Sequence, residues 1–293
     1  MRALLKSGLR RFAHALGENE QTSVHSPPRL PLGDKHATVL AVATQKGGVG
    51  KTTTSVNLAA ALARYHDKRV LLLDLDPQGH VATALQKVVH KGGGRLSEVL
   101  TDDGTGREVM EIVTATDIPG LDVTPLDPRL GAAEDLLGTR IGKEFILRDA
   151  LKVTRTHYDV IVIDCPPNLG NLSLNGLVAA DRVLIPCDPS PLALSGAQAL
   201  LSAIGQISRL LNPDIDVLGL LMTRVDGRNV TLNQAIMAEV EESYGDAVVP
   251  VQIGINSDLA KAQHAGRDVF AYAPDSRGAT QYRDLATWVV HQG

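Results

Sequence analysis

Residues 45–54 read QKGGVGKTTT, and this ten-residue segment determines the architecture that the rest of the chain can adopt. An apolar run, Thr38–Ala43, precedes it, and an Ala- and Leu-rich run, Ser55–Tyr65, follows it. These runs predict a buried strand and a helix, so the glycines lie in the turn between them. In such a turn, backbone N–H groups can surround an anion that the helix dipole also attracts, and glycine lets a phosphate approach closely. The segment therefore predicts a phosphate-binding loop.

Side chains of the same segment suit a nucleotide and its metal ion. Lys51 would reach the β- and γ-phosphates, and the Thr52 hydroxyl would coordinate Mg²⁺. The usual pattern has glycine at the position of Gln45, so this loop is a variant with an additional lysine, Lys46. Lys46 is too close to the loop to fold back easily onto its own phosphates, which favours its delivery across a dimer interface. Nucleotide contacts are expected from Gln45, Lys46, Gly47, Gly48, Val49, Gly50, Lys51, Thr52 and Thr53.

Four further segments extend this pattern along the chain. They read LLLDLDPQG at residues 71–79, YDVIVIDCPP at 158–167, NGLVAADRVLIP at 175–186 and SRGA at 276–279. Together with the loop, whose family form is KGGxGKT, they resemble the ParA/MinD family of ATPases with a deviant Walker A loop, and ParA proteins in particular. In order, the matching segments cover most of residues 38–290.

Several roles follow from this resemblance and from the positions of the residues. Asp164 ends the Walker B strand and would hold Mg²⁺ through water, together with Thr52. The resemblance implies that Asp76 orients or activates the attacking water, so the expected catalytic residues are Lys46, Lys51 and Asp76. Asp74 would be either a further partner of Mg²⁺ or a structural residue. Asn256 falls where the family has an asparagine near the base, and ATP and Mg²⁺ are the implied ligands.

Alternating apolar segments predict the fold class. The pattern is typical of an α/β protein with a doubly wound, mostly parallel sheet and helices on both faces, the P-loop NTPase fold of the deviant Walker A type. Ligands bind such sheets at the carboxyl ends of the strands, so Asp74, Asp76 and Asp164 are expected to converge on the loop. Strands are expected near 38–44, 69–74, 121–124, 158–164, 182–187 and 216–222. Helices are expected near 52–65, 142–156, 192–211, 230–243 and 276–291.

One ATPase domain is predicted over residues 37–293, preceded by a basic amphipathic segment and a Pro-containing linker over 1–36. In residues 1–16, apolar side chains form one helical stripe and Lys6, Arg10 and Arg11 lie away from it. Such a segment can lie on an anionic membrane, bind a partner, add charge for DNA, pack on its own domain, remain disordered or serve as a transit peptide. No apolar run in the sequence is long enough to span a bilayer.

The net charge of −4 gives no global signature of nucleic-acid binding, so any DNA contact must come from a local patch. Arg224 and Arg228 stand where ParA proteins carry basic DNA contacts. In the later loop, Ile255 and Asp258 stand where the ParA pattern has two arginines. Lys261, Arg267 or Arg277 could compensate for these missing arginines. Ser190-Pro191 also replaces a more usual Glu-aromatic pair. Cys165 and Cys187 are expected to be small core residues of a reduced, cytosolic protein.

The resemblance to ParA implies an ATPase that dimerises on ATP, binds nonspecific DNA on the nucleoid and hydrolyses ATP slowly until a partner stimulates it. A ParB-like or other cargo-bound activator would be that partner, and the cargo would be DNA or a large protein assembly in the cytoplasm. The alternative is a MinD-like membrane switch that recruits a protein. MinD proteins have a C-terminal anchor, whereas residues 281–293 here fit a packed final helix better. A metabolic ligase or metal insertase would need a further substrate or cluster site, and the sequence shows no cysteine pair for one.

Overall fold

The computed structural model describes residues 36–102, 106–228, 236, 238, 240 and 242–292. The predicted N-terminal segment and linker, apart from His36, lie outside the described residues. Most of the helix expected at 230–243 does so too, although Val240 is described as buried and Ile236 as packed against the same core. No helix in the described part of the chain combines the length and the apolar character that crossing a membrane requires.

The described residues form one eight-stranded sheet in the order β3-β4-β2-β5-β1-β6-β7-β8. Neighbouring strands are parallel except for β3 and β4, which pair in the antiparallel sense. This arrangement confirms the predicted doubly wound, mostly parallel sheet. The strands are β1 Thr38–Val42, β2 Val70–Asp74, β3 Thr114–Ala115, β4 Leu121–Val123, β5 Val160–Asp164, β6 Arg182–Cys187, β7 Asp216–Val225 and β8 Ile253–Gly254.

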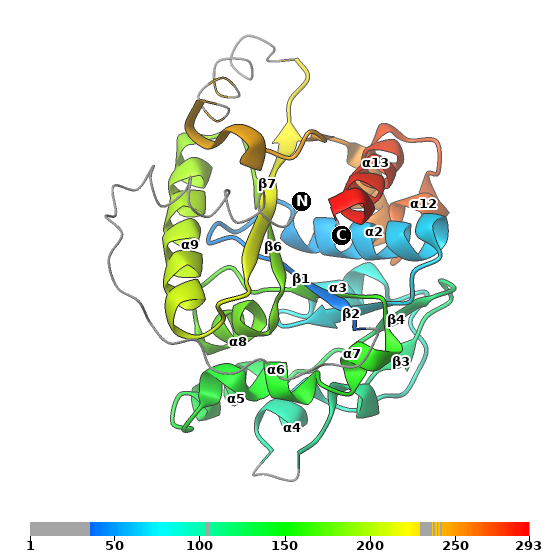
Figure 1. Cartoon of the computed structure of the whole chain (residues 1–293). Helices are drawn as coiled ribbons and strands as arrows, with labels where there is room; N and C mark the ends of the chain where they lie inside the picture. Colours follow the sequence, from blue (N-terminus) through cyan, green and yellow to red (C-terminus); the bar gives the residue numbers. More distant parts are fainter. Residues whose placement is uncertain are drawn as a thin grey trace.

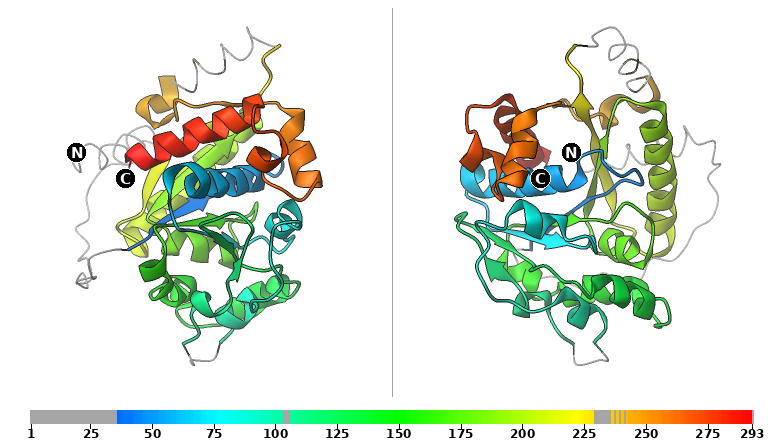
Figure 2. Two further views of the ribbon diagram at one scale, coloured as in Figure 1. Left: turned by 90° about the vertical axis from the view of Figure 1, so that its right-hand side faces the viewer. Right: turned by 180° about the vertical axis from the view of Figure 1, so that it is seen from behind.

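Helices cover both faces of the sheet, as the views in Figure 1 and Figure 2 show. One face packs against α2 Lys51–His66, α3 His80–Ala84, α11 Ser257–His264, α12 Val269–Tyr272 and α13 Arg277–Gln292. The opposite face packs against α4 Leu96–Leu100, α5 Leu130–Leu137, α6 Ile146–Ala150, α8 Asn171–Ala179 and α9 Pro191–Leu210. Three short 3-10 helices lie at Val109–Glu111, Lys143–Phe145 and Gly245–Ala247.

The central strands supply both apolar cores because their side chains alternate between the two faces. In β1, Val39 and Ala41 belong to the core under α8 and α9, whereas Leu40 and Val42 belong to the core under α2 and α13. β5 divides in the same way between the two cores. Since both faces are buried, these strands are apolar at almost every position, which is why their sequences lack a polar alternation.

The final helix packs on the domain, as the sequence indicated for residues 281–293. Tyr282, Leu285 and Ala286 of α13 are buried, and the Tyr282 hydroxyl lies 3.2 Å from Thr54 Oγ1 of α2. Figure 2 shows α13, in red, lying along α2. The apolar side of this helix is therefore used inside the domain.

The continuous helix predicted over 142–156 is wrong. The chain instead forms the 3-10 helix Lys143–Phe145, then α6, and after a turn the four-residue α7, Thr154–His157. The turn, residues 151–153, ends at Val153, and Thr154 begins α7; both residues are β-branched and have low helix propensity. Thr154 is buried, and its Oγ1 accepts a hydrogen bond from Met110 N at 3.0 Å. This tertiary contact decides the position of the break.

Candidate nucleotide-binding site

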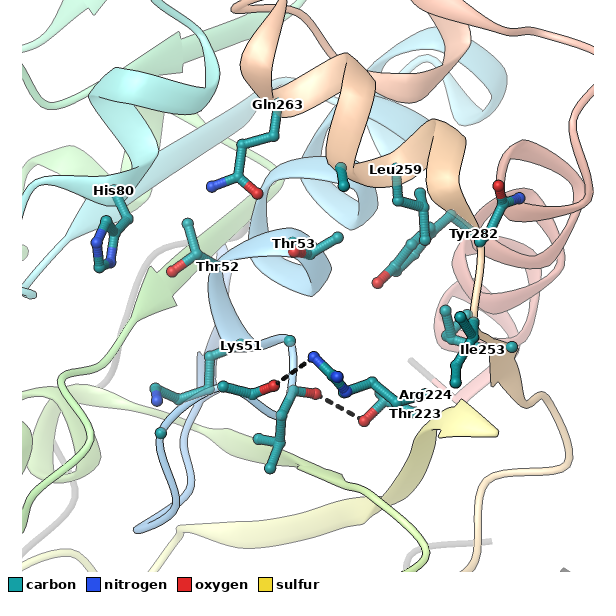
Figure 3. A pocket seen from close by; sticks show the side chains of 18 of the residues that line it. Lys51, Thr52, Thr53, His80, Thr223, Arg224, Ile253, Leu259, Gln263 and Tyr282 are labelled. Carbon is teal, nitrogen blue, oxygen red and sulfur yellow. Dashed lines mark hydrogen bonds between the residues drawn. The ribbon is translucent and has the colours of Figure 1, made fainter. Parts of the chain in front are cut away.

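The carboxyl ends of β1, β2, β5, β7 and β8 surround a cavity of about 590 Å³. This is the edge of the sheet at which the strand-end motifs were expected to converge. Figure 3 shows His80 and Gln263 near Thr52 and Thr53, with Tyr282 further along the same cavity. The lining consists of Gly47, Gly48, Val49, Gly50, Lys51, Thr52, Thr53, Asp76, His80, Pro167, Thr223, Arg224, Ile253, Gly254, Ile255, Asn256, Ser257, Leu259, Ala260, Gln263 and Tyr282.

The loop between β1 and α2 has the backbone conformation that its glycines allow. Gly48 has φ +77° and Gly50 has φ +93°, a left-handed region that L side chains rarely adopt. No neighbouring atom lies within 4 Å of a Cβ built on either residue, so the requirement for glycine is conformational. Gly50 directly precedes Lys51, the first residue of α2, so the loop delivers its N–H groups to the positive end of that helix.

Lys51 lines the cavity and is largely buried. Burial lowers the pKa of its ammonium group, while the nearby carboxylates of Asp164 and Asp76 act in the opposite direction. A buried lysine beside an anion-binding loop is suited to neutralise phosphate charge. The structure thus places Lys51 at the cavity, directly after the glycine loop.

Asp164, at the end of β5, is fully buried and accepts two hydroxyl hydrogen bonds. Thr52 Oγ1 donates to Oδ2 at 2.7 Å, and Ser55 Oγ donates to Oδ1 at 2.8 Å. Burial raises the pKa of Asp164 to about 6, although both hydroxyl contacts lower it. The Thr52 hydroxyl and a carboxylate held together at the loop fit Mg²⁺, which proteins bind through one or two side chains and the substrate's phosphates.

Asp74 and Asp76 belong to the turn that follows β2. Asp74 Oδ1 accepts a hydrogen bond from Asp76 N at 2.9 Å, and its Oδ2 accepts one from Val81 N at 3.2 Å. Asp76 lines the cavity, and its Oδ1 accepts a hydrogen bond from Gln78 N at 3.0 Å. Burial and the charge of Asp164 raise the pKa of Asp74 well above its usual range. Asp74 therefore holds the turn that presents Asp76, which favours the structural role among its two predicted ones.

Lys46 and Gln45, both expected to contact the nucleotide, do not line the cavity, whereas residues 47–53 do. Lys46 Nζ lies 2.9 Å from Oδ2 and 3.0 Å from Oδ1 of Asp188, and 3.0 Å from Ser190 Oγ. Ser190 Oγ also donates to Asp188 Oδ1 at 2.7 Å. We call these three residues the lysine clasp. It gives a physical account of Ser190, whose difference from the ParA pattern the sequence left unexplained.

The sequence did not indicate that the end of β7 contacts the loop. Thr223 Oγ1 donates to Val49 O at 2.7 Å, and Arg224 Nη1 donates to Gly48 O at 3.1 Å. Arg224, a candidate for DNA contact, also lines the cavity. Asn256 lines it too, while its side chain caps α11 by accepting a hydrogen bond from Asp258 N at 2.8 Å.

The other candidates for DNA contact lie at three places. Arg228 is 86% exposed at its side chain and pairs with Asp226 at 2.9 Å. Arg277 lies beside the same turn, 3.9 Å from a Cβ built on Gly227, and donates to Ile255 O at 2.9 Å. Lys261 pairs with Asp258 at 3.2 Å on α11. Arg267 is exposed beyond the end of that helix. Arg277 therefore lies beside the turn that carries Arg228.

Comparisons with known proteins agree with this site. A family model described as an AAA domain matches residues 37–217. The sporulation initiation inhibitor protein Soj of Bacillus subtilis is 40% identical over 255 residues, which are 87% of this chain and 99% of Soj. The chromosome partitioning protein ParA of Myxococcus xanthus is 38% identical over 247 residues, 84% of this chain and 86% of ParA.

Among solved structures, cobyrinic acid a,c-diamide synthase from Mycobacterium smegmatis with bound ADP and magnesium is 35% identical. It aligns with a TM-score of 0.73 over 87% of this chain and 95% of its own. The glycine loop, the two aspartate-bearing strand ends and the similarity over nearly the whole described domain lead to one assignment. The chain belongs to the ParA/MinD family of ATPases with a deviant Walker A loop.

Proposed function

We propose that this protein is a Mg²⁺-dependent ATPase that dimerises on ATP and uses partner-stimulated hydrolysis to segregate or position DNA or a large protein cargo. One observation carries the proposal: Lys51, the Thr52–Asp164 pair and Asp76 meet at one cavity of about 590 Å³. This volume falls in the range of small-molecule sites. The M. smegmatis relative was solved with ADP and magnesium bound, which supports adenine nucleotide and Mg²⁺ as ligands here.

Each part of the site has a task in phosphoryl transfer to water, which needs charge neutralisation and a positioned nucleophile. The loop N–H groups and Lys51 would bind the phosphates. Thr52 and Asp164 would hold Mg²⁺, which would neutralise charge on the phosphate oxygens when bound. Asp76, at the cavity wall, would orient the attacking water or accept its proton. Because Asp74 fixes the turn on which Asp76 lies, Asp76 is held in place before the nucleotide binds.

Lys46 would complete the site of a partner subunit. In the single chain the clasp holds its ammonium group away from the cavity lining, so its own phosphates are not its natural target. Two copies facing each other through their loops would place each Lys46 toward the other's nucleotide. Such a dimer differs from the monomer in its exposed surface, which makes the nucleotide a switch for partner binding. Similarity to Soj and ParA supports this homodimer.

In this proposal, the ATP-bound dimer lies in the cytoplasm and binds nonspecific DNA of the nucleoid. Arg277 lies beside the turn that carries Arg228, both arginines are exposed, and dimerisation would double this basic pair. Lys261 and Arg267 would extend the contact along α11. A ParB-like or other cargo-bound protein would stimulate hydrolysis and release the dimer. The similarity to a chromosome partitioning ParA supports this assignment.

Two other functions make different predictions. A MinD-like membrane switch would need an amphipathic anchor, and the final helix is packed on α2 instead. Residues 1–36 would then have to provide the membrane anchor. An amide synthase, as the name of the M. smegmatis relative suggests, would need an acid substrate and a nitrogen source. Cys165 and Cys187 are both buried, and burial raises the pKa of each thiol, so neither offers a nucleophile for glutamine.

The proposal is tested by binding of the purified protein to nonspecific duplex DNA at low and moderate salt, with ATP, ADP or no nucleotide. We expect binding only with ATP, falling steeply with salt, loss of binding in Lys46→Ala, and weaker binding with a shallower salt dependence in Arg228→Ala. Intact ATPase activity without DNA binding in any nucleotide state would overturn the nucleoid assignment. Pelleting with anionic liposomes, with and without residues 1–36, would then test the membrane alternative.

A further inference from the structure

Two consecutive residues at the end of β7 bind two consecutive carbonyl groups of the phosphate loop. Thr223 Oγ1 donates to Val49 O, and Arg224 Nη1 donates to Gly48 O, as the dashed lines in Figure 3 show. The contacts join parts of the chain that are 174 and 176 residues apart. We call these two residues the loop brace. Thr223 is almost completely buried, so its hydroxyl bond is shielded from water.

The backbone at the brace is distorted in a way that aims Arg224 at the loop. Arg224 has φ +54°, a left-handed conformation that non-glycine residues rarely adopt. The pairing of β7 with β8 shifts register between Thr223 and Val225, directly around this residue. Such bulges redirect side chains and are common beside active sites, and strained residues persist where surrounding contacts hold them. Here the distortion allows both Thr223 and Arg224 to face the loop.

The bonded carbonyl groups determine where the next N–H groups point. In a planar trans peptide the C=O of one residue and the N–H of the next point in opposite directions. Fixing Gly48 O and Val49 O on the brace therefore turns Val49 N–H and Gly50 N–H away from it. Those N–H groups belong to the anion-binding turn. A loop carbonyl rotated into the cavity would instead repel phosphate.

The loop depends on contacts from other parts of the chain, because its glycines permit several backbone conformations. Glycine populates several backbone regions with similar ease, and no atom lies within 4 Å of a Cβ built on Gly47, Gly48 or Gly50. Apart from the buried Val49 side chain, packing therefore does not select one orientation of the glycine peptide groups. The hydrogen bonds to the two successive carbonyl groups, Gly48 O and Val49 O, do select one orientation.

We propose that Thr223 and Arg224 are positioning residues for the polyphosphate of the nucleotide, which set the loop N–H groups before the ligand arrives. This assigns Arg224 to the nucleotide site of its own chain in place of DNA contact. The inference deepens the proposed function, since it names a determinant of phosphate affinity, but it requires neither dimerisation nor DNA. Preorganisation of a site raises affinity by removing the free-energy cost of ordering it on binding.

The test measures the affinity of the full chain for ADP and for pyrophosphate, both with Mg²⁺, by calorimetry. Thr223→Val should weaken binding of both ligands by about tenfold, the effect of one buried hydrogen bond. Arg224→Met should weaken it less, by roughly two- to fivefold, because the Arg224 hydrogen bond is exposed to solvent. Thr223→Ser keeps the hydroxyl and should stay within about twofold of the unmodified protein. The KM for ATP should rise in the same order as the dissociation constants.

Matched controls separate positioning from a general loss of stability. Thr116→Val removes another buried hydroxyl that donates to a carbonyl at 2.7 Å, that of Leu121, far from the loop. Arg69→Met removes an arginine paired with Asp159 at the start of β2, the opposite edge of the sheet. Both should leave ADP affinity unchanged, and thermal denaturation of every variant establishes that it is folded.

Several outcomes would overturn the brace. They are unchanged affinity in Thr223→Val and Arg224→Met, an equal loss in Thr223→Ser and Thr223→Val, or a loss of DNA binding in Arg224→Met at unchanged ADP affinity. If the protein binds ADP but neither dimerises nor binds DNA, the proposed function fails and the brace is still decided by these affinities. If it binds neither ADP nor pyrophosphate, both fail.

Discussion

Lys46 and Asp188 form a two-point ion pair within a single chain, with Nζ 2.9 Å from Oδ2 and 3.0 Å from Oδ1. Ser190 Oγ contacts the same ammonium group at 3.0 Å. A lysine that acts on the nucleotide of a partner subunit cannot keep all three contacts while it binds the partner's phosphate. In the proposed dimer the clasp would therefore oppose dimerisation, and ATP would have to compete with Asp188 for Lys46.

Replacing Asp188 by Asn should favour the ATP-dependent dimer. The variant removes the negative charge that holds Lys46 but keeps the size of the side chain. Because the pair is partly exposed, with 31% and 20% of the two side chains accessible, the change should be modest. We expect the dimer dissociation constant with a nonhydrolysable ATP analogue to fall roughly three- to tenfold. Analytical ultracentrifugation measures it.

Two companion variants identify the cause of that effect. Lys46→Ala should prevent the dimer with or without Asp188→Asn, since the clasp matters only through the lysine. Labelling of Lys46 by an amine-reactive reagent, followed by mass spectrometry, should rise in nucleotide-free Asp188→Asn. A weaker dimer in Asp188→Asn would mean that Asp188 belongs to the dimer contact itself.

Replacing Asp76 by Asn should abolish hydrolysis while leaving nucleotide binding almost intact. The Asn side chain can still accept the hydrogen bond from Gln78 N, so the turn is expected to stay in place. Loss of a group that orients or deprotonates the water should slow steady-state ATP hydrolysis by about 10²- to 10⁴-fold. Binding of ATP should stay within about twofold. A large loss of ATP affinity would instead assign Asp76 to nucleotide binding.

The sequence could predict the core of the nucleotide site because its residues lie within short motifs at strand ends. Lys51, Thr52, Asp76 and Asp164 all reach the same region, since the carboxyl ends of parallel strands share one edge of the sheet. The main strands were predicted because buried parallel strands are continuous apolar runs. Topology thus turns local patterns into a three-dimensional site.

The missed features depend on contacts that are distant in sequence. The helices α3 and α4 have five residues each, too few to show a helical period, and tertiary packing maintains them. The nine-residue α8 is buried almost all round, so it has no apolar stripe. Asp188 and Thr223 reach the loop across 142 and 174 residues, and no local pattern indicates such pairs. Strand β7 also runs to Val225, beyond the predicted end at 222.

Replacing Asp164 by Asn should stabilise the nucleotide-free protein at neutral pH. Burial raises the pKa of Asp164 to about 6, above the ordinary 3.8, and Asp74 on the neighbouring strand is shifted in the same direction. A carboxyl whose pKa is raised on folding contributes stability below its unfolded pKa, and this contribution is lost as pH rises through about 6. The Asp164→Asn variant does not undergo this loss of stability. Its free energy of unfolding should therefore exceed that of the unmodified protein by an amount that grows between pH 5 and pH 8.

Thermal denaturation at several pH values measures this difference. The shift corresponds to about 1–3 kcal/mol at pH 8, or roughly 2–8 °C in Tm. The same variant should lose Mg²⁺-dependent ATP hydrolysis, because a neutral amide is a poor Mg²⁺ ligand. Asp149→Asn, an exposed carboxyl paired with Arg148 and Lys152, provides a control that should show no such growth with pH. A variant that is less stable than the unmodified protein at pH 8 would contradict the argument.

Replacing Asp258 by Arg should strengthen DNA binding by the ATP-bound protein. Asp258 stands where the ParA pattern has an arginine, and it pairs with Lys261 at 3.2 Å, which removes that charge from any contact with phosphate. The cap of α11 uses the backbone N–H of residue 258, so the substitution leaves it intact. One additional phosphate contact should make the slope of log K against log salt steeper by about 0.9, with roughly tenfold tighter binding near 0.1 M salt.

Arg228→Ala should change the slope by a similar amount in the opposite direction, because Arg228 is exposed and free to reach phosphate once it leaves Asp226. Fluorescence anisotropy with a nonspecific duplex at several salt concentrations measures both slopes, and ADP-bound protein serves as the control. If Asp258→Arg leaves the slope unchanged while Arg228→Ala reduces it, α11 lies outside the DNA contact, and Arg228 with Arg277 makes up the basic patch.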